Sequence, residues 1–135
     1  MRKGTTDNNR ANVSSIQTFF DKLLRGKLTK NLFFDEVPVS FGKDWKDVVV
    51  VDCHNPMRDY DAIGMQTVLI LLYVKQNPYG VKDVKAMQKL ETKLNELIDN
   101  NDDPYYHISR KGSYSSYDSV NDIFFNIVQI NLIIA

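Results

Sequence analysis

The chain has 135 residues, of which 43% are hydrophobic and 25% are charged, with 17 basic and 17 acidic side chains. This length suits one domain, which can bury enough surface to fold without a metal or a disulfide. The zero net charge argues against a dedicated nucleic-acid binder, which usually carries a basic excess. The single cysteine, Cys53, excludes an internal disulfide and favours a reducing compartment.

The first twelve residues are polar, so we expect a flexible segment over 1–12 followed by one domain over 13–135. This segment lacks the apolar stretch of a signal peptide. A first helix is predicted from Val13 to Arg25, with Gly26 as its stop. Ser14 and Gln17 fit a capping box, although Asn12 could serve as the cap instead. The stripe expected to be buried consists of Ile16, Phe19, Phe20, Leu23 and Leu24.

The next part of the chain contains two apolar runs and a long polar connection. Leu32–Phe34 is either a short strand or an apolar plug, and Pro38 confines the neighbouring 37–41 segment to a sheet edge. Val48–Val51 is predicted to be a strand with both faces apolar. The polar connection over 52–64 is interpreted as a wide hairpin loop within the domain.

The central stretch is a second strand that is apolar on both faces, followed by a turn and a long helix. The strand is predicted over Gln66–Val74, the turn over Asn77–Gly80, and the helix from Val81 to Asn100. Alternate residues of a strand point to opposite faces, and one helical layer covers only one of them. The second face, which carries Leu69, Leu71 and Tyr73, therefore needs another cover.

The end of the chain is predicted to form a strand over Tyr105–Arg110, a loop over Lys111–Ser119 and a last strand over Val120–Ile134. Ile123–Ala135 is the longest apolar segment, and it is too short and too often interrupted for a membrane helix. The order of elements predicts an α+β fold, with a mostly antiparallel β-sheet and two main helices packed on one face.

The sequence shows no motif for catalysis, for a cofactor or for a metal. Asp52-Cys53-His54 is the one cluster that resembles a catalytic site, but adjacent strand residues point to opposite faces, which favours a buried cysteine and a surface histidine. The alternative is a small ligand-binding or enzymatic domain with a pocket near Cys53, His54 and His107. One cysteine and two histidines match no zinc pattern.

Two groups of aspartates are candidates for a metal site or an acid–base pair. Asp99, Asp102 and Asp103 lack the spacing, the glycine and the closing glutamate of a calcium loop. Asp59 and Asp61 are typical of solvated turns. We therefore predict no metal ligand among them.

Cations and tyrosines alternate in the predicted loop near the end of the chain, at Arg110, Lys111, Tyr114 and Tyr117. This combination occurs at protein interfaces and in sites that stack single-stranded nucleic acid, and it also occurs in ordinary hairpin tips. The predicted interface consists of these four residues together with Leu69, Leu71 and Tyr73.

From about Ser14 to Ala135 the chain resembles the tail terminator, or tail-completion, proteins of long-tailed bacteriophages and prophages, which also serve in head–tail joining. The resemblance rests on the order of elements, on the two-faced strand through Leu69-Leu71-Tyr73-Val74, and on the Asn77-Pro78-Tyr79-Gly80 turn. The apolar stripe of the following helix completes it: Val84, Met87, Leu90, Leu94, Leu97 and Ile98. The long polar N-terminus departs from the family and leaves a related neck or connector component as an alternative.

The resemblance implies a structural protein of the virion and no enzyme. Family members form rings, typically of six subunits, that cap the completed tail tube and present a surface to head-completion or connector proteins. The expected partners are further copies of the chain, the tail tube protein and the head-completion proteins, with DNA passing through the ring without sequence readout. The protein would assemble in the cytoplasm of the bacterial host, and no catalytic residue is implied. Heterologous contacts that close on themselves produce such rings.

Overall fold

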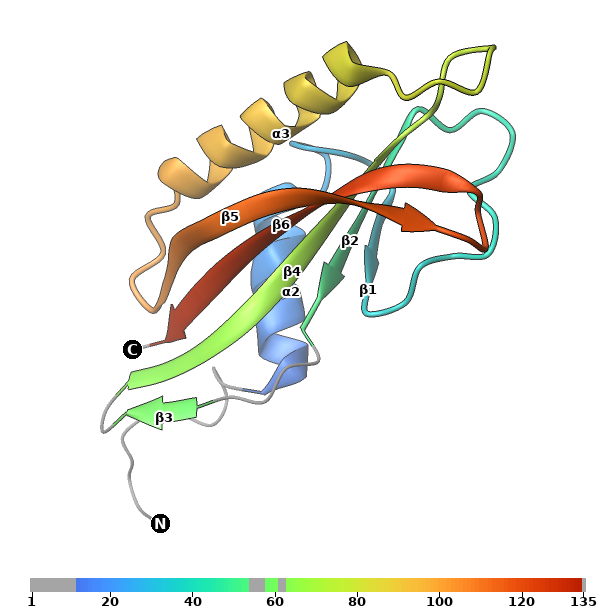
Figure 1. Cartoon of the computed structure of the whole chain (residues 1–135). Coiled ribbons are helices and arrows are strands. Elements are labelled where there is room, and N and C mark those ends of the chain that lie inside the picture. Colours follow the sequence, from blue (N-terminus) through green and yellow to red (C-terminus); the bar gives the residue numbers. More distant parts are fainter. Residues whose placement is uncertain (1–11, 54–57, 61–62, 135) are drawn as a thin grey trace.

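The computed structural model describes residues 12–53, 58–60 and 63–134 (Figure 1). The predicted flexible segment therefore lies outside the described residues, except for Asn12. The elements, in chain order, are α2 (Val13–Leu24), β1 (Leu32–Phe34), β2 (Asp47–Asp52), β3 (Arg58–Tyr60), β4 (Ile63–Val74), α3 (Val84–Asp99), β5 (Tyr106–Asp118) and β6 (Ile123–Ile134).

The strands form one sheet in the order β1-β2-β4-β6-β5, and β3 pairs with the beginning of β4. Every pairing is antiparallel except that of β1 with β2. The three longest strands, β4, β6 and β5, lie side by side and make up most of the sheet. The predicted α+β class with a mostly antiparallel sheet is confirmed.

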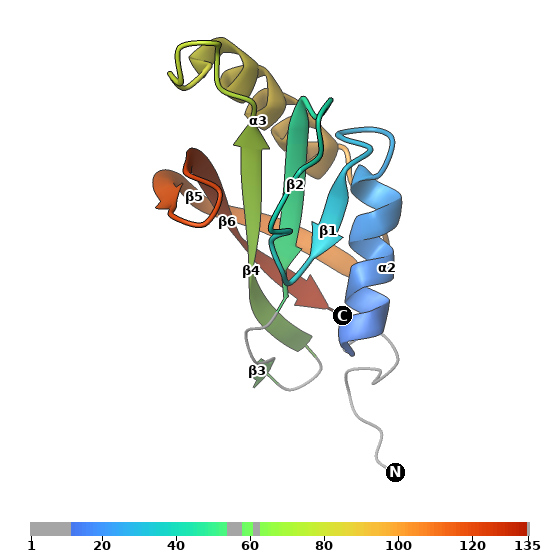
Figure 2. The same ribbon diagram turned by 90° about the vertical axis from the view of Figure 1, so that its right-hand side faces the viewer.

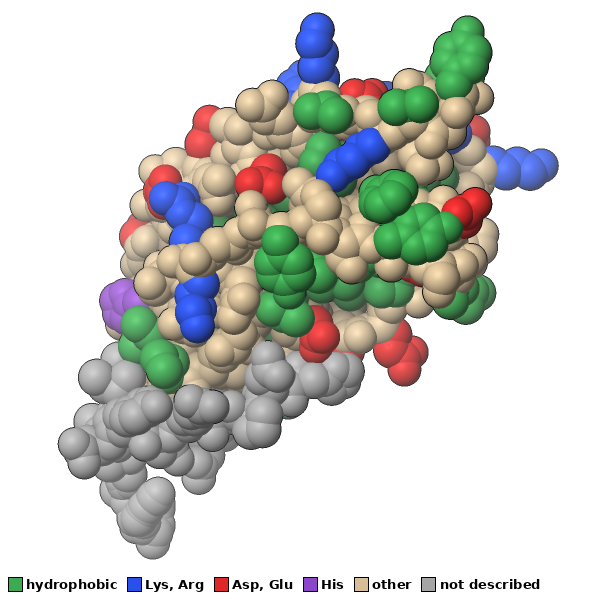
Figure 3. All heavy atoms as spheres, viewed as in Figure 1, with side chains coloured by type: hydrophobic (Ala, Val, Ile, Leu, Met, Phe, Trp, Pro, Cys, Tyr) green, Lys and Arg blue, Asp and Glu red, His purple; other side chains and the backbone are tan. Residues whose placement is uncertain are grey.

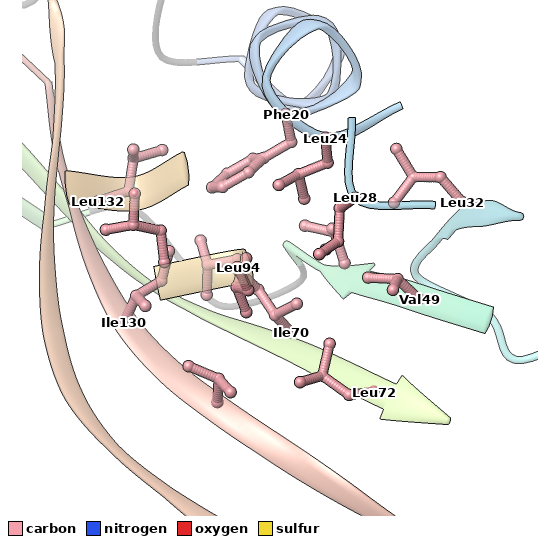
Figure 4. Close-up of a cluster of buried hydrophobic side chains, with 14 of the residues drawn as sticks. Phe20, Leu24, Leu28, Leu32, Val49, Ile70, Leu72, Leu94, Ile130 and Leu132 are labelled. Carbon is pink, nitrogen blue, oxygen red and sulfur yellow. The ribbon is translucent and has the colours of Figure 1, made fainter. Parts of the chain in front are cut away.

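Both helices pack on the same face of this sheet, as the two views in Figures 1 and 2 show. Phe20 and Leu24 of α2 and Leu94 of α3 meet Ile70 of β4 and Ile130 of β6 in one apolar core (Figure 4). All five side chains are fully buried. The predicted packing of two helices on one face is confirmed, and this layer supplies the main core.

The first helix begins and ends with local signals that differ in part from the predicted ones. The Asn12 side chain caps α2 by accepting from the Ser15 N–H at 2.8 Å. The capping box of Ser14 with Gln17 is wrong, because the Gln17 amide instead donates to Asp35 of the loop after β1 at 2.9 Å. The helix ends at Leu24, and Gly26 follows with a φ of 77° that favours glycine.

The second helix begins three residues later than predicted, at Val84 instead of Val81. The Asp83 carboxylate caps it by accepting from the Ala86 N–H at 3.0 Å. The preceding turn is closed by Asn77, whose side chain accepts from the N–H groups of Tyr79 and Val81 at 2.9 and 3.1 Å. The Asp83 side-chain cap therefore sets the N-terminal boundary of α3.

The predicted loop over Lys111–Ser119 is wrong. Strand β5 continues to Asp118, with a bulge between Arg110 and Gly112, and it pairs with β6 along its whole length. The turn is confined to 119–122, so β6 begins at Ile123 instead of Val120. Serine, glycine and tyrosine suggest a loop locally, but pairing with an apolar neighbour strand outweighs that preference.

The connections on either side of β2 differ in structure. Leu32–Phe34 forms a strand, as one of the two predicted alternatives. The segment over 37–41 forms no strand and instead belongs to the connection between β1 and β2. In the predicted wide loop over 52–64, β3 pairs with β4 and makes a short hairpin, and residues 54–57 and 61–62 lie outside the described residues.

Candidate subunit interface

The sheet face opposite the helices carries the side chains that the helical layer cannot cover. Part of this face is covered by the connection between β1 and β2, where Phe41 packs on Trp45 with ring centroids 4.8 Å apart and on Tyr73 at 5.1 Å. Tyr73 in turn stacks on Phe125 at 4.6 Å. With Val48, Val50 and Ile123, these aromatic side chains form a second, smaller core.

No helix of the described residues packs on the rest of this face, where Leu71 and Ile127 border the small core. We call this area the open face, and it is formed by Leu69 and Leu71 of β4 and by Ile127, Gln129 and Ile133 of β6. All five side chains are partly exposed. Leu71 is paired with Ile127, so these two apolar side chains lie side by side across the strands, whereas Leu69 is paired with the polar Gln129. The open face is therefore a mixed apolar and polar surface at the centre of the sheet.

The structure corrects one member of the predicted interface. Tyr73 is 1% exposed, and its hydroxyl donates to the Asp118 carboxylate at 3.0 Å. Burial, followed by this hydrogen bond, raises its pKa above the ordinary value. Tyr73 belongs to the second core and cannot contact another molecule directly, whereas Leu69 and Leu71 lie on the open face as the interface prediction requires.

The four predicted residues of the hairpin do not share one face. Tyr114 pairs with Ile127 and lies beside the open face, with 51% of its surface exposed. Arg110 lies on the helix side, where its guanidinium contacts the Asp99 carboxylate at 2.9 Å. Tyr117 also lies on the helix side, packed on Phe124 with centroids 5.0 Å apart. Lys111 is the bulged residue between the two regular parts of β5. The predicted cluster is thus divided between both faces of the hairpin.

A polar seam that the sequence did not reveal joins α3 to the hairpin. Lys82, just before the helix, donates to Asn126 of β6 at 2.8 Å and to Ser115 of β5 at 3.2 Å. Glu91 of α3 accepts from the Asn126 amide at 3.2 Å and from the Ser113 hydroxyl at 3.2 Å. A shallow groove of about 410 Å³ runs along this seam. The contributing residues are separated by more than twenty positions, so no local pattern could have indicated it.

Figure 3 shows the surface of the molecule on the hairpin side. Exposed hydrophobic side chains are spread over this side, and basic and acidic side chains lie between them. Tyr114, Tyr117 and Phe124 of the hairpin are each about half exposed, at 51%, 46% and 50%. The hairpin therefore presents aromatic surface to the surroundings on both of its faces.

Cys53 and His107, two of the three residues of the predicted alternative pocket, do not lie together. Cys53 is 1% exposed and packs in the core under the helices, whereas His107 is exposed on β5, paired with Ile133 of the opposite face. Burial, followed by the nearby carboxylates of Asp35 and Asp52, raises the pKa of the Cys53 thiol to about 12. The thiol is therefore protonated at neutral pH and is a poor nucleophile. His54, the third member of the pocket, lies outside the described residues.

The aspartates of the α3–β5 connection have structural partners. The Asp103 carboxylate accepts from the N–H groups of Tyr105 and Tyr106 at 2.8 and 3.1 Å, which fixes the start of β5. Within the part of the chain that the structure describes, no group of three metal-ligating side chains comes together. Asp61 lies outside that part, and the strand pairing places Asp59 opposite Gly64.

None of the helices in the described ranges is both long and apolar enough to cross a membrane. No protein-family model and no curated protein matches the sequence.

Proposed function

We propose that the chain is a structural virion-assembly protein of the tail terminator kind, which forms a ring that caps the tail tube and joins it to the head. The observation that carries this proposal is the open face, where partly exposed Leu69, Leu71 and Ile127 lie at the centre of the sheet without a helical cover. Apolar surface in this position is typical of a subunit contact.

The arrangement of the elements supports the same function. An N-terminal helix, a two-faced central strand, a turn, a second helix and a closing hairpin follow one another in the order of the family that the sequence resembles. One face of each subunit would be held by its own helices and the other by a neighbouring subunit. Such a contact joins two different surfaces, and a closed set of these contacts makes a ring.

The first experiment is a measurement of molar mass by light scattering behind a sizing column, over a concentration series. A closed oligomer near six times 15.6 kDa supports the proposal, and electron microscopy should then show rings with a central channel. A strict monomer at every concentration in the micromolar range, whatever the salt, would count against it.

A pair of variants tests whether the open face is the contact. Leu71→Asp places a charge on the open face and should reduce the oligomer to smaller species, because burying an unpaired charge at an interface is costly. Val13→Asp is the matched control, since Val13 is 49% exposed at the start of α2 on the helix side. Equal masses for both variants and the unchanged protein would show that the open face is not the contact.

A ligand-binding or enzymatic domain remains the alternative from another class. It would need a pocket near Cys53, which the structure places in the core, away from His107. A third hypothesis, binding of single-stranded nucleic acid through the hairpin, is weakened because Arg110 is paired with Asp99. Salt-dependent binding that is lost in a Tyr114→Ala variant would revive it.

A further inference from the structure

The two edges of the sheet differ in how they are protected. At one edge β1 is three residues long, and the Arg25 guanidinium donates to the backbone oxygens of Leu32 at 3.1 Å and Lys30 at 3.4 Å. At the other edge β5 is thirteen residues long, and among the described strands it pairs only with β6. A long exposed edge strand is a template for pairing with another strand.

The first half of β5 carries features that discourage such pairing. The Asn101 amide donates to the Tyr106 backbone oxygen at 2.8 Å, and Arg110 and Lys111 bring two cations to the bulge. Bulges and charged residues are devices that protect an edge. The part after the bulge, Gly112–Asp118, contains no proline and a single charge, Asp118 at its end, and all of its residues except Ser116 and Asp118 are exposed. Lys82 reaches the Ser115 hydroxyl at 3.2 Å from the helix side. The least protected part of the edge is therefore this regular segment after the bulge.

The geometry points to a second copy of this chain as the occupant: we propose that the 112–118 segments of two copies pair antiparallel about a two-fold axis at Ser115. This is the one register that pairs all seven residues of the regular segment. It places Tyr114 opposite Ser116 of the partner subunit and Tyr117 opposite Ser113 of the partner subunit, so each large side chain meets a small one. The register therefore avoids crowding between tyrosine side chains that lie directly opposite each other.

The charges at the two ends of the segment also suit this register. In this register Gly112 lies opposite Asp118 of the partner subunit, and Lys111 comes one position before Gly112. The symmetry repeats this arrangement, so a basic and an acidic residue lie near each other at both ends of the pairing. A parallel arrangement would instead place like charges side by side, which is destabilising.

This contact is distinct from the proposed ring contact. A two-fold contact uses the same surface on both copies, whereas a ring requires two different surfaces on each subunit. The edge pairing would join two free subunits, or two rings, into one continuous sheet. It therefore does not depend on the proposed function, and the two can fail separately.

Cysteine cross-linking tests the register. In a Ser115→Cys variant the two introduced thiols meet at the axis, and mild oxidation should yield a covalent dimer of twice 15.6 kDa. Ser113→Cys is the matched control, because it replaces another exposed serine of the same strand. Its thiols would lie about 13 Å apart along the paired strands, from a rise of about 3.3 Å per residue. The unchanged protein controls for the native Cys53, which is buried.

The proposal is supported by a covalent dimer of Ser115→Cys that exceeds that of Ser113→Cys by at least severalfold. It is overturned if neither variant cross-links, or if Ser113→Cys cross-links as well as or better than Ser115→Cys. Far-UV circular dichroism checks that both variants fold. Combining Ser115→Cys with Leu71→Asp separates the two contacts, because the cross-link should persist when the open face is disrupted.

The charge contact gives an independent measurement. Lys111→Glu in the Ser115→Cys background should slow cross-linking about two- to fivefold at low salt, the range expected for an exposed ion pair. Lys85→Glu, an exposed lysine of α3, is the control and should leave the rate unchanged. An unchanged rate for Lys111→Glu would overturn the proposed antiparallel register.

Discussion

The two faces of the central sheet are built from the same strands but are used differently. On the helix side, Ile70 and Leu72 of β4 and Ile130 and Leu132 of β6 are 0% exposed. On the other side, Leu69 and Leu71 of the same β4 strand are only partly buried. Neighbouring residues of β4 therefore lie either in a fully buried core or on a surface that can still bury apolar area.

This difference teaches how a two-faced apolar strand should be interpreted. The unbroken run of Val, Ile and Leu along β4 indicates that both faces of the strand avoid water. It does not indicate which element covers each face. Here the cover on one side comes from two helices, and on the other side a loop bearing Phe41 and Trp45 reaches only part of the sheet. The remaining area is the open face on which the proposed ring contact rests.

The largest expected effect compares one leucine from each side. Leu94→Ala in α3 removes a fully buried side chain and should lower the free energy of unfolding by about 2–5 kcal/mol. Leu71→Ala on the open face should cost about 1 kcal/mol in the isolated subunit, because its side chain is already partly hydrated. Urea unfolding monitored by circular dichroism at low protein concentration measures both.

Equal losses of unfolding free energy for the two leucine variants would contradict the difference between the faces, since the open face would then behave as an interior in the single subunit. A loss for Leu71→Ala that grows with protein concentration would support it further. That result would mean that the side chain becomes buried on association, because association stabilises the folded state by mass action.

A smaller loss of unfolding free energy is expected when the hydrogen bond between Tyr73 of the second core and Asp118 is removed. Tyr73→Phe removes the hydroxyl that donates to Asp118 and should cost about 1.5–3 kcal/mol near neutral pH, as for hydrogen bonds to a charged group. Tyr117→Phe is the matched control, because Tyr117 also donates to an aspartate, Asp122, but is 46% exposed. If Tyr117→Phe lowers the free energy of unfolding as much as Tyr73→Phe, burial does not determine how much this hydrogen bond stabilises the fold.

The same bond gives this region a pH dependence at both extremes. The pKa of Tyr73 is raised, so its contribution is fully present below the ordinary tyrosine pKa of 10.0 and is lost as the pH rises beyond it. Burial raises the pKa of Asp118, but hydrogen bonds from Asn121, Tyr73 and Val120 outweigh it and lower the pKa below 3.8. Its contribution is present above pH 3.8 and is lost as the pH falls below that value. Chemical unfolding in Tyr73→Phe should show a smaller loss at alkaline pH.

The sequence predicted the parts of the fold that depend on apolar periodicity. Met87, Leu90 and Leu94 of the predicted α3 stripe are buried as expected, whereas Val84, its first member, is 66% exposed. Val48–Val51 and Gln66–Val74 lie within strands. These signals are strong because they report on burial directly. The placement of Leu69 and Leu71 on the second face followed from the same periodicity.

The parts that failed depend on partners far away in the chain. Gly112–Tyr117 has a loop-like composition and becomes a strand only because β6 pairs with it. Strand alternation places Tyr73 on the face that the helices do not cover, which predicts an interface residue, but Phe41 and Phe125, from distant segments, cover it. Single-sequence patterns contain no information on such contacts. Whether the open face and the hairpin bind other subunits stays a prediction.

The smallest loss of unfolding free energy is expected at the solvated rim of α3, where the exposed ion pair of Arg110 with Asp99 lies, in contrast to the buried leucines on the inner side of the helix. Arg110 and Asp99 join β5 to the end of α3 at 2.9 Å, but their side chains are 43% and 60% exposed. Arg110→Ala should therefore lower the free energy of unfolding by less than about 1 kcal/mol, and the loss should shrink as salt screens the pair. Asp102→Asn, an exposed aspartate of the next connection, is the control. A loss above about 2 kcal/mol that persists at high salt would mean that the rim, together with the buried leucines, fixes the position of α3 on the hairpin.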